Sequence, residues 1–293
     1  MEVVRQKSDF DSVNDNIIKG EYPELINSTI KFEGKNNLLF CEPGVVLESS
    51  SIYFGGNNAV VYIRSSIFHT MLNISVFSGS VFHLGKDCYF NKPMTVILSS
   101  DRNFFIGDDC IFSTGISVRT ADPHLIYDCS TKKRINETKS VFLGDHVWVG
   151  QDCTLLKGTE IDSGSIIGAA CLITGKKIPH NSSWAGVPAK LIKDNVFWDR
   201  ACVNNWDEAK VNLSSDYTKF AGKFRKDTGS DAWIYSFRRD ESISFSQLDK
   251  DLISRKDSLE KYEYLYELNS KKIKNRFVHN IAFPKKRFKL FGK

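Results

Sequence analysis

The chain has 293 residues, of which 41% are hydrophobic and 26% are charged, with 40 Lys and Arg against 35 Asp and Glu. This composition is typical of a globular protein with one large domain or two modest ones. No apolar run reaches the length that spans a bilayer, and the first residues lack the apolar stretch of a secretory signal. We therefore expect a cytoplasmic protein.

The N-terminal part reads as short strands after an unassigned start. Residues 1–30 are mixed and polar, and they support no assignment. From Ile30 to about Phe82, short apolar runs are separated by Gly, Asn and Ser, which is typical of closely spaced strands.

A six-residue repeat dominates the middle of the chain. From 143 to 173 every sixth residue is a large aliphatic one: Leu143, Val149, Leu155, Ile161, Ile167 and Ile173. Four positions after most of these aliphatic residues comes a mostly small residue, a position that we call the small slot. The slot is occupied by Val147, Cys153, Thr159, Ser165 and Cys171, and further on by Ser183 and Ala189. A fixed short period indicates stacked coils that bury one face against their neighbours. Three hexads close one triangular coil, so the pattern predicts a parallel β-helix over 31–192, with early coils that are less regular.

Four of the seven cysteines follow the same spacing. Cys88, Cys110, Cys153 and Cys171 each lie four residues after an aliphatic residue that opens a hexad. They are expected to be compact apolar fillers. The sequence has no CxxC pair and no Cys/His cluster at zinc spacing, so neither a metal site nor a disulfide is expected.

The repeat is interrupted by an excursion over 120–140, which is polar, partly basic and off the hexad pattern. An insertion of this length in a solenoid is usually functional, because the coils do not need it. His124 follows Asp122-Pro123 in this segment, and a neutral imidazole is a natural general base near neutral pH. From the residues alone, a surface histidine without a catalytic role is the alternative.

The C-terminal extension, 193–293, leaves the repeat. Leucines and a tyrosine at helical spacing predict a helix over about 247–275 that packs along the prism or contacts another protomer. The tail, 271–293, has nine Lys and Arg and no acid, so the rest of the chain has 31 basic residues against 35 acidic. The tail is expected to be a solvated end, or to bind an anionic membrane surface or an acidic polymer.

The segment "IGDDC...TADPHLIYD...KRIN...FLGDHVWVGQDCTLLKGTEIDSGSIIGAACLITGKKIP...AGVPAKLIK" resembles the left-handed β-helix, hexapeptide-repeat acyltransferases. It is most similar to bacterial O-acetyltransferases that modify sugars of capsule and other surface polysaccharides, in particular those of sialic-acid capsules. The resemblance covers roughly 84–200. It implies a homotrimer that uses acetyl-CoA, needs no metal, and acetylates a carbohydrate acceptor rather than binding nucleic acid.

The resemblance also implies roles for individual residues. His124 matches the catalytic base, and Trp148 matches an indole that lines the active site near the acetyl end of the donor. Gln151, Ala169 and Thr174 match positions along the pantetheine arm of coenzyme A. Lys190 and Lys193 match cations that meet its phosphates, which agrees with the preference of phosphate for Lys and Arg.

Three other functions remain open at this point. An N-acetyltransferase of an amino sugar, or a transferase to a small acceptor, would use the same base and donor. A γ-type carbonic anhydrase would need three histidines around zinc, and His124 has no histidine within twenty residues. A non-catalytic scaffold or polysaccharide-binding module would need no base at all.

Overall fold

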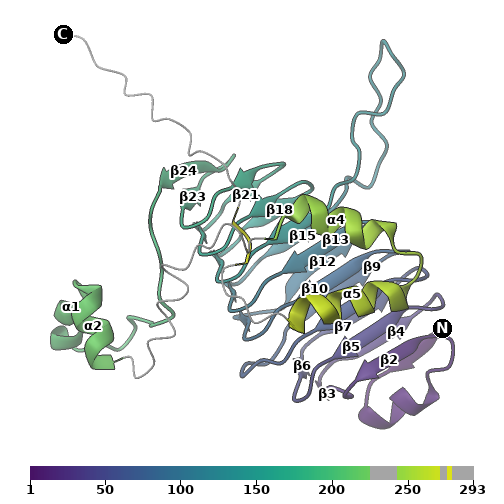
Figure 1. Ribbon diagram of the computed structural model, residues 1–293, viewed down its shortest axis with the longest axis horizontal. Coiled ribbons are helices and arrows are strands. Elements are labelled where there is room, and N and C mark those ends of the chain that lie inside the picture. The colour runs from purple at the N-terminus through teal and green to yellow at the C-terminus, as the bar shows by residue number, and fades with distance from the viewer. Residues whose placement is uncertain (225–242, 271–275, 279–293) are drawn as a thin grey trace.

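The computed structural model describes residues 1–224, 243–270 and 276–278, and most of them form a three-sided stack of strands (Figure 1). Sheet 1 contains β1 (Glu2–Val4), β4 (Thr29–Phe32), β7 (Ser51–Phe54), β9 (Leu72–Val76), β12 (Met94–Leu98), β15 (Ser117–Arg119), β18 (Thr154–Leu156) and β21 (Leu172–Ile173). Sheet 2 contains β2 (Ile17–Gly20), β5 (Leu38–Cys41), β8 (Val60–Ile63), β10 (Val81–Leu84), β13 (Asn103–Ile106), β16 (Val141–Leu143), β19 (Glu160–Ile161) and β22 (Lys177–Ile178).

The third side is split into two parts. The pair β3 (Glu24–Ile26) and β6 (Val46–Glu48) forms it in the first coils. Sheet 3 follows, with β11 (Tyr89–Phe90), β14 (Ile111–Phe112), β17 (Trp148–Val149), β20 (Ile166–Ile167), β23 (Ser183–Ala185) and β24 (Lys190–Lys193). The strands pair in parallel except at the two ends of the stack, where β1–β4 and β23–β24 are antiparallel. The predicted parallel β-helix is confirmed.

The coils have two lengths. In sheet 1 the inward residues of the early coils pair in register at intervals of 22: Ile30, Ile52, Ile74, Val96 and Val118. The later pair Leu155–Ile173 is 18 residues apart, which is three hexads. The early coils are therefore regular, contrary to expectation, but each has four residues more than a coil of hexads.

The stack begins before residue 31, the residue at which the sequence pattern predicts its start. After a 3-10 helix (Lys7–Ser12), β2 pairs in parallel with β5, from Ile17 opposite Leu38 to Gly20 opposite Cys41. Short strands with polar outer faces gave no repeat signal in this region, but their inward residues continue the core.

The interior is filled as the hexads predicted. The aliphatic residues of the repeat are buried, and so are Cys88, Cys110, Cys153 and Cys171 in the small slot. Gly150 marks how tightly the corners stack, because a Cβ there would lie 2.7 Å from the backbone nitrogen of Ala169. Large side chains point inward along the strands and small ones sit where consecutive corners touch.

The extension forms two helical pairs. The first, α1 (Glu208–Ser214) and α2 (Tyr217–Phe224), projects from the end of the stack, and the second, α4 (Phe245–Ser254) and α5 (Ser258–Ser270), lies across sheet 2 (Figure 1). The prediction of one helix over about 247–275 is wrong, because this stretch contains two helices, α4 and α5. Asp257 accepts a hydrogen bond from the Glu260 backbone N–H at 2.9 Å and caps a second helix, so the chain bends between α4 and α5.

Helices cover sheet 2 because its outer face is apolar. Its middle strands, from β5 to β16 in the sheet, are mostly hydrophobic and are buried at every position, which is typical of strands that are buried on both faces. The outer residues pack with the buried side of α4 and α5 in one cluster: Leu38, Phe40, Val60, Tyr62, Val81, Phe105, Phe142, Phe245, Leu248, Leu252, Leu265, Leu268 and Phe277. Among the described residues, no helix has the length and apolar character that crossing a bilayer requires.

Part of the basic tail is packed rather than solvated. Arg276 is 1% exposed, and its guanidinium lies 2.9 Å from the Asp145 carboxylate and 3.5 Å from that of Asp108. Phe277 stacks on Phe245 with ring centroids 4.8 Å apart. The expected membrane or polymer contact of the tail falls mainly on 271–275 and 279–293, which lie outside the described residues.

Candidate active site

The excursion leaves the stack at the corner between sheets 1 and 2, after β15, and returns at β16. It projects as a hairpin (Figure 1), closed by an antiparallel bridge between Tyr127 and Arg134. The Asp128 carboxylate accepts hydrogen bonds from the backbone N–H groups of Ser130 and Thr131 at 3.0 and 2.7 Å and orders the turn. The excursion is therefore a defined element with its own hydrogen bonds.

His124 lies at the foot of this hairpin and is exposed. The Asn136 side-chain amide donates to the His124 carbonyl at 2.6 Å, and its oxygen accepts from the Ile126 N–H at 2.9 Å. Asn136 thus joins the outgoing and returning arms on either side of the histidine. Two residues before His124, the Asp122 carboxylate lies 2.5 Å from the Lys157 ammonium on the next coil.

The pair of Asp122 and Lys157 anchors the histidine segment to the stack. The hydrogen bond from Lys157 lowers the pKa of the Asp122 carboxyl below its usual value, so this carboxyl is ionised at neutral pH. Lys157 lies at the same corner as the excursion, between β18 and β19, and Thr174 lies at this corner one coil further on. The structure therefore groups the predicted base with one predicted donor contact, the exposed Thr174.

The other predicted donor contacts lie at the opposite edge of sheet 1. Gln151 and Ala169 are exposed at the corner between sheets 3 and 1, on consecutive coils, and the Ala170 N–H donates to the Gln151 carbonyl at 2.7 Å. Trp148 is 41% exposed on the outer face of sheet 3. Its register continues through Ile166 and Ser183 to Lys193. Trp148 and Lys193 therefore stand in one column on this sheet.

Trp148 rests on a buried aromatic support that the sequence did not indicate. The Trp198 ring lies 6.1 Å from the Trp148 ring and stacks on His146, with centroids 3.8 Å apart and planes 2° apart. His146 is fixed by its Nδ1, 2.6 Å from the Asp109 carboxylate. Trp198 belongs to the extension. It reaches Trp148 because the chain after β24 passes back along the corner between sheets 2 and 3, where His146 lies.

Lys190 and Lys193 are exposed on β24, which folds back antiparallel on β23 and ends the stack. Two separated exposed cations on one strand suit a ligand with several phosphates. Within one chain, then, His124 and Thr174 lie at one edge of sheet 1, and Trp148, Gln151 and Ala169 lie beyond its other edge. A single protomer does not bring the predicted base and the predicted acetyl-lining indole together.

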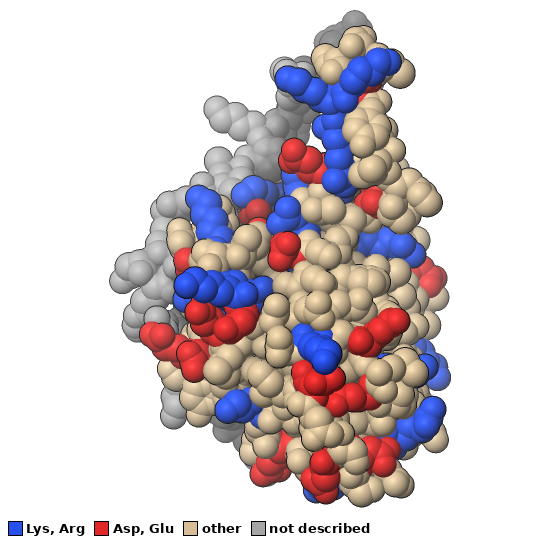
Figure 2. Space-filling view, turned by 90° about the vertical axis from the view of Figure 1, so that its right-hand side faces the viewer, with Lys and Arg blue, Asp and Glu red and all other residues tan. Residues whose placement is uncertain are grey.

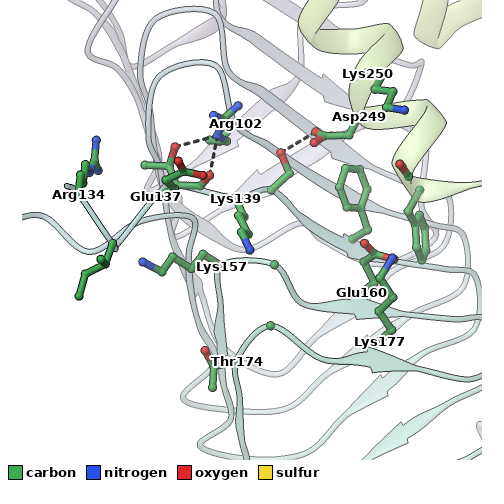
Figure 3. Close-up of a pocket in the computed structure, with 18 residues that line it drawn as sticks. Arg102, Arg134, Glu137, Lys139, Lys157, Glu160, Thr174, Lys177, Asp249 and Lys250 are labelled. Atoms are coloured by element: carbon green, nitrogen blue, oxygen red, sulfur yellow. Dashed lines mark hydrogen bonds and ion pairs between the residues drawn. The ribbon is translucent and has the colours of Figure 1, made fainter. Parts of the chain in front are cut away.

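A cavity that the sequence did not predict opens at the foot of the excursion (Figure 3). Its volume is about 690 Å³, within the usual range of ligand sites. We call it the basic groove, since its charged lining residues are mostly cations: Arg102, Arg134, Lys139, Lys157, Lys177 and Lys250, with Glu137, Glu160 and Asp249. These residues come from the turn before β13, the excursion, the coil corners, β19, β22 and α4, so no single sequence window contains the signal.

Comparisons with known proteins agree with this architecture, although no protein-family model matches the chain. The chain is 29% identical to a polysialic acid O-acetyltransferase of Neisseria meningitidis over 67% of its own length and 93% of the relative's. It is 35% identical to a polysialic acid O-acetyltransferase of Escherichia coli O1:K1 over 85 residues, a match that spans only 27% of that relative's length.

Among solved structures, the polysialic-acid-specific acetyltransferase NeuO superposes with a TM-score of 0.58 and 29% identity, covering 71% of this chain and 93% of that one. Fold and sequence therefore agree over most of the stack. The chain is thus similar in sequence and in its β-helical fold to the polysialic acid O-acetyltransferases.

Proposed function

We propose that this protein transfers an acetyl group from acetyl-CoA to a sugar hydroxyl of a bacterial surface polysaccharide, with a sialic-acid-containing polymer as the favoured acceptor. The observation that carries the proposal is the similarity to the meningococcal polysialic acid O-acetyltransferase along nearly all of that protein. The exposed histidine at the foot of an ordered excursion supplies the chemical group that the reaction requires.

The proposed active site lies between protomers of a homotrimer. The predicted site residues occupy two edges of sheet 1, and one protomer would place its His124 edge against the Gln151 edge of the next. The described residues of α4 and α5 cover sheet 2, which leaves the outer surface around sheet 1 for this contact. Assembly would then complete a site that one chain holds only in halves.

In the proposed mechanism His124 takes the proton from the sugar hydroxyl as its oxygen attacks the thioester carbonyl. The tetrahedral intermediate collapses, the carbon–sulfur bond breaks, and the imidazolium returns the proton to the leaving thiolate. Trp148 lines the acetyl end of the donor. No acyl-enzyme forms, and holding both substrates together supplies much of the acceleration.

The donor would lie in the contact between two protomers. Gln151 and Ala169 of one protomer and Thr174 of the other would contact its pantetheine arm, and Lys190 and Lys193 would meet its phosphates. Acetyl-CoA is a cytoplasmic metabolite, so the reaction would take place in the cytoplasm, at the inner face of the membrane if the tail binds anionic lipid.

The test is acetyl transfer from acetyl-CoA to a panel of polysaccharides, followed by mass spectrometry and NMR. His124→Ala is expected to lower the rate by about 10²- to 10⁴-fold, the usual contribution of a general base. His69→Ala, which removes another exposed histidine that pairs with Glu48 at 2.9 Å, is the matched control and should keep the wild-type rate.

Each outcome selects one function. An acetyl group that mild alkali removes is an ester and supports O-acetylation, whereas a product stable to alkali is an amide and would favour the N-acetyltransferase. Transfer that His124→Ala leaves unchanged would refute the base assignment, and a wild type that transfers no acetyl group to any member of the panel would favour a non-catalytic scaffold.

A further inference from the structure

We propose that the basic groove binds the acceptor as an acidic polysaccharide chain, and that helix α4 of the C-terminal extension forms one of its walls. The catalytic meaning of this site rests on the proposed function, but the binding itself can be measured without acetyl transfer. The groove lies at the foot of the excursion that carries His124. His124 does not line it, but the lining residue Lys157 pairs with Asp122, two residues before His124.

Most cations of the groove come from three parts of the chain. The returning arm of the excursion contributes Arg134 and Lys139, the coil corners contribute Lys157, and α4 contributes Lys250 (Figure 3). The corner at Gly158 makes room for the excursion, because a Cβ there would meet the Lys139 side chain at 3.2 Å.

The lining has an excess of positive charge that the protein does not neutralise. Lys157 pairs with Asp122 and Lys177 pairs with Glu160 at 3.0 Å. In the part of the chain that the structure describes, no ion pair involves Lys139 or Lys250. Figure 2 shows Lys and Arg side chains along the projecting excursion and on the surface below it. A regularly charged polyanion would be attracted along this surface.

The wall formed by α4 is held rigidly against the stack. The Asp249 carboxylate accepts hydrogen bonds from the Ser140 hydroxyl at 2.6 Å and from the Asn103 amide at 2.8 Å. Phe245 stacks on Phe142 with centroids 5.2 Å apart. Asp249 is therefore occupied in fixing α4 to the residue where the excursion ends, and Lys250 beside it is held at the rim of the groove.

A carboxylated saccharide fits this groove better than the phosphates of the donor. The two lysines proposed to meet those phosphates, Lys190 and Lys193, lie on β24 at the end of sheet 3, whereas the basic groove lies at the corner of sheets 1 and 2. A polymer with one carboxylate per sugar would meet Arg134, Lys139 and Lys250 in turn, as separated single charges.

The experiment measures binding of a polysialic acid oligomer and of an uncharged dextran of equal length to the full chain, by calorimetry without acetyl-CoA. The double variant Lys139→Ala/Lys250→Ala is expected to bind the acidic oligomer about tenfold more weakly. Lys31→Ala, at an exposed position on β4 near the other end of the stack, is the control and should bind as wild type. Wild-type binding should weaken as salt is raised, and dextran should not bind.

Three results would overturn the inference: unchanged affinity in the double variant, equal loss in Lys31→Ala, or a wild type that binds both polymers alike. A double variant that loses coenzyme A affinity instead would assign the groove to the donor and overturn it as well. If the acidic oligomer binds as expected but no acetyl group is transferred to any saccharide, the groove stands and the proposed function fails.

Discussion

His83 should make the attachment of the C-terminal helices sensitive to acid. The ring is fully buried under sheet 2's helical cover, stacked on Phe105 with centroids 4.0 Å apart and planes 3° apart. Its Nδ1–H donates to the Ile106 carbonyl at 3.0 Å, and its Nε2 accepts from the Asn269 amide of α5 at 2.9 Å. This arrangement suits only the neutral ring, because a proton on Nε2 would face the N–H of the Asn269 amide.

Burial, reinforced by the positive charges of Arg64 and Arg276, lowers the pKa of His83 to about 3, against the opposing effects of the Ile106 carbonyl and Asp108. In the unfolded chain the ring titrates at about 6.5. Between these values the unfolded state binds more protons, so the free energy of unfolding falls as pH drops through 6.5 towards 3. From pH 7.5 to pH 5.0 this linkage amounts to about 2 kcal/mol.

The assay is urea unfolding at the two pH values for wild type and His83→Phe. The variant loses absolute stability by about 1–3 kcal/mol, because it removes the two buried hydrogen bonds that the ring makes with the Ile106 carbonyl and the Asn269 amide. Its acid-induced loss between pH 7.5 and 5.0 should nevertheless be about 2 kcal/mol smaller than that of wild type. His69→Gln, at an exposed site, should keep the wild-type difference. Equal acid-induced losses in wild type and His83→Phe would refute the reasoning.

Three further predictions concern the core, the buried ion pair and the tail. Leu155→Ala should lower the free energy of unfolding by about 3 kcal/mol, since the side chain is fully buried in the interior column, whereas the exposed Leu125→Ala should change it by less than about 0.5 kcal/mol in the same urea titration. Asp145→Asn should cost about 3–5 kcal/mol, because it leaves the buried Arg276 guanidinium under-compensated; a melting temperature equal to wild type would contradict this. Deleting 279–293, which spares the packed residue Arg276, should weaken sedimentation with anionic vesicles at low salt, and equal binding would exclude a membrane role for these residues.

Much of the fold follows from local spacing. The hexads between Leu143 and Ile173 determine both the inward residues and the corners. A residue that recurs every six positions takes the same inward place on each successive side of an 18-residue coil, and it returns to the same side after eighteen. The early coils leave a weaker repeat in the sequence, because their inward residues, such as Ile30, Ile52 and Ile74, recur only every 22 residues. Over that distance, strands of alternating polarity look alike at any register.

Short-range patterns account for the coiled core, the place of the excursion and the histidine within it, because each depends on the order of residues along a short stretch. The tertiary structure decided that α4 and α5 cover sheet 2, that Arg276 is buried against Asp145, and that the basic groove gathers Lys139 and Lys250. These contacts join residues more than a hundred positions apart. Their partners are chosen by which apolar faces and charges meet when the extension folds back, and no local pattern records that choice.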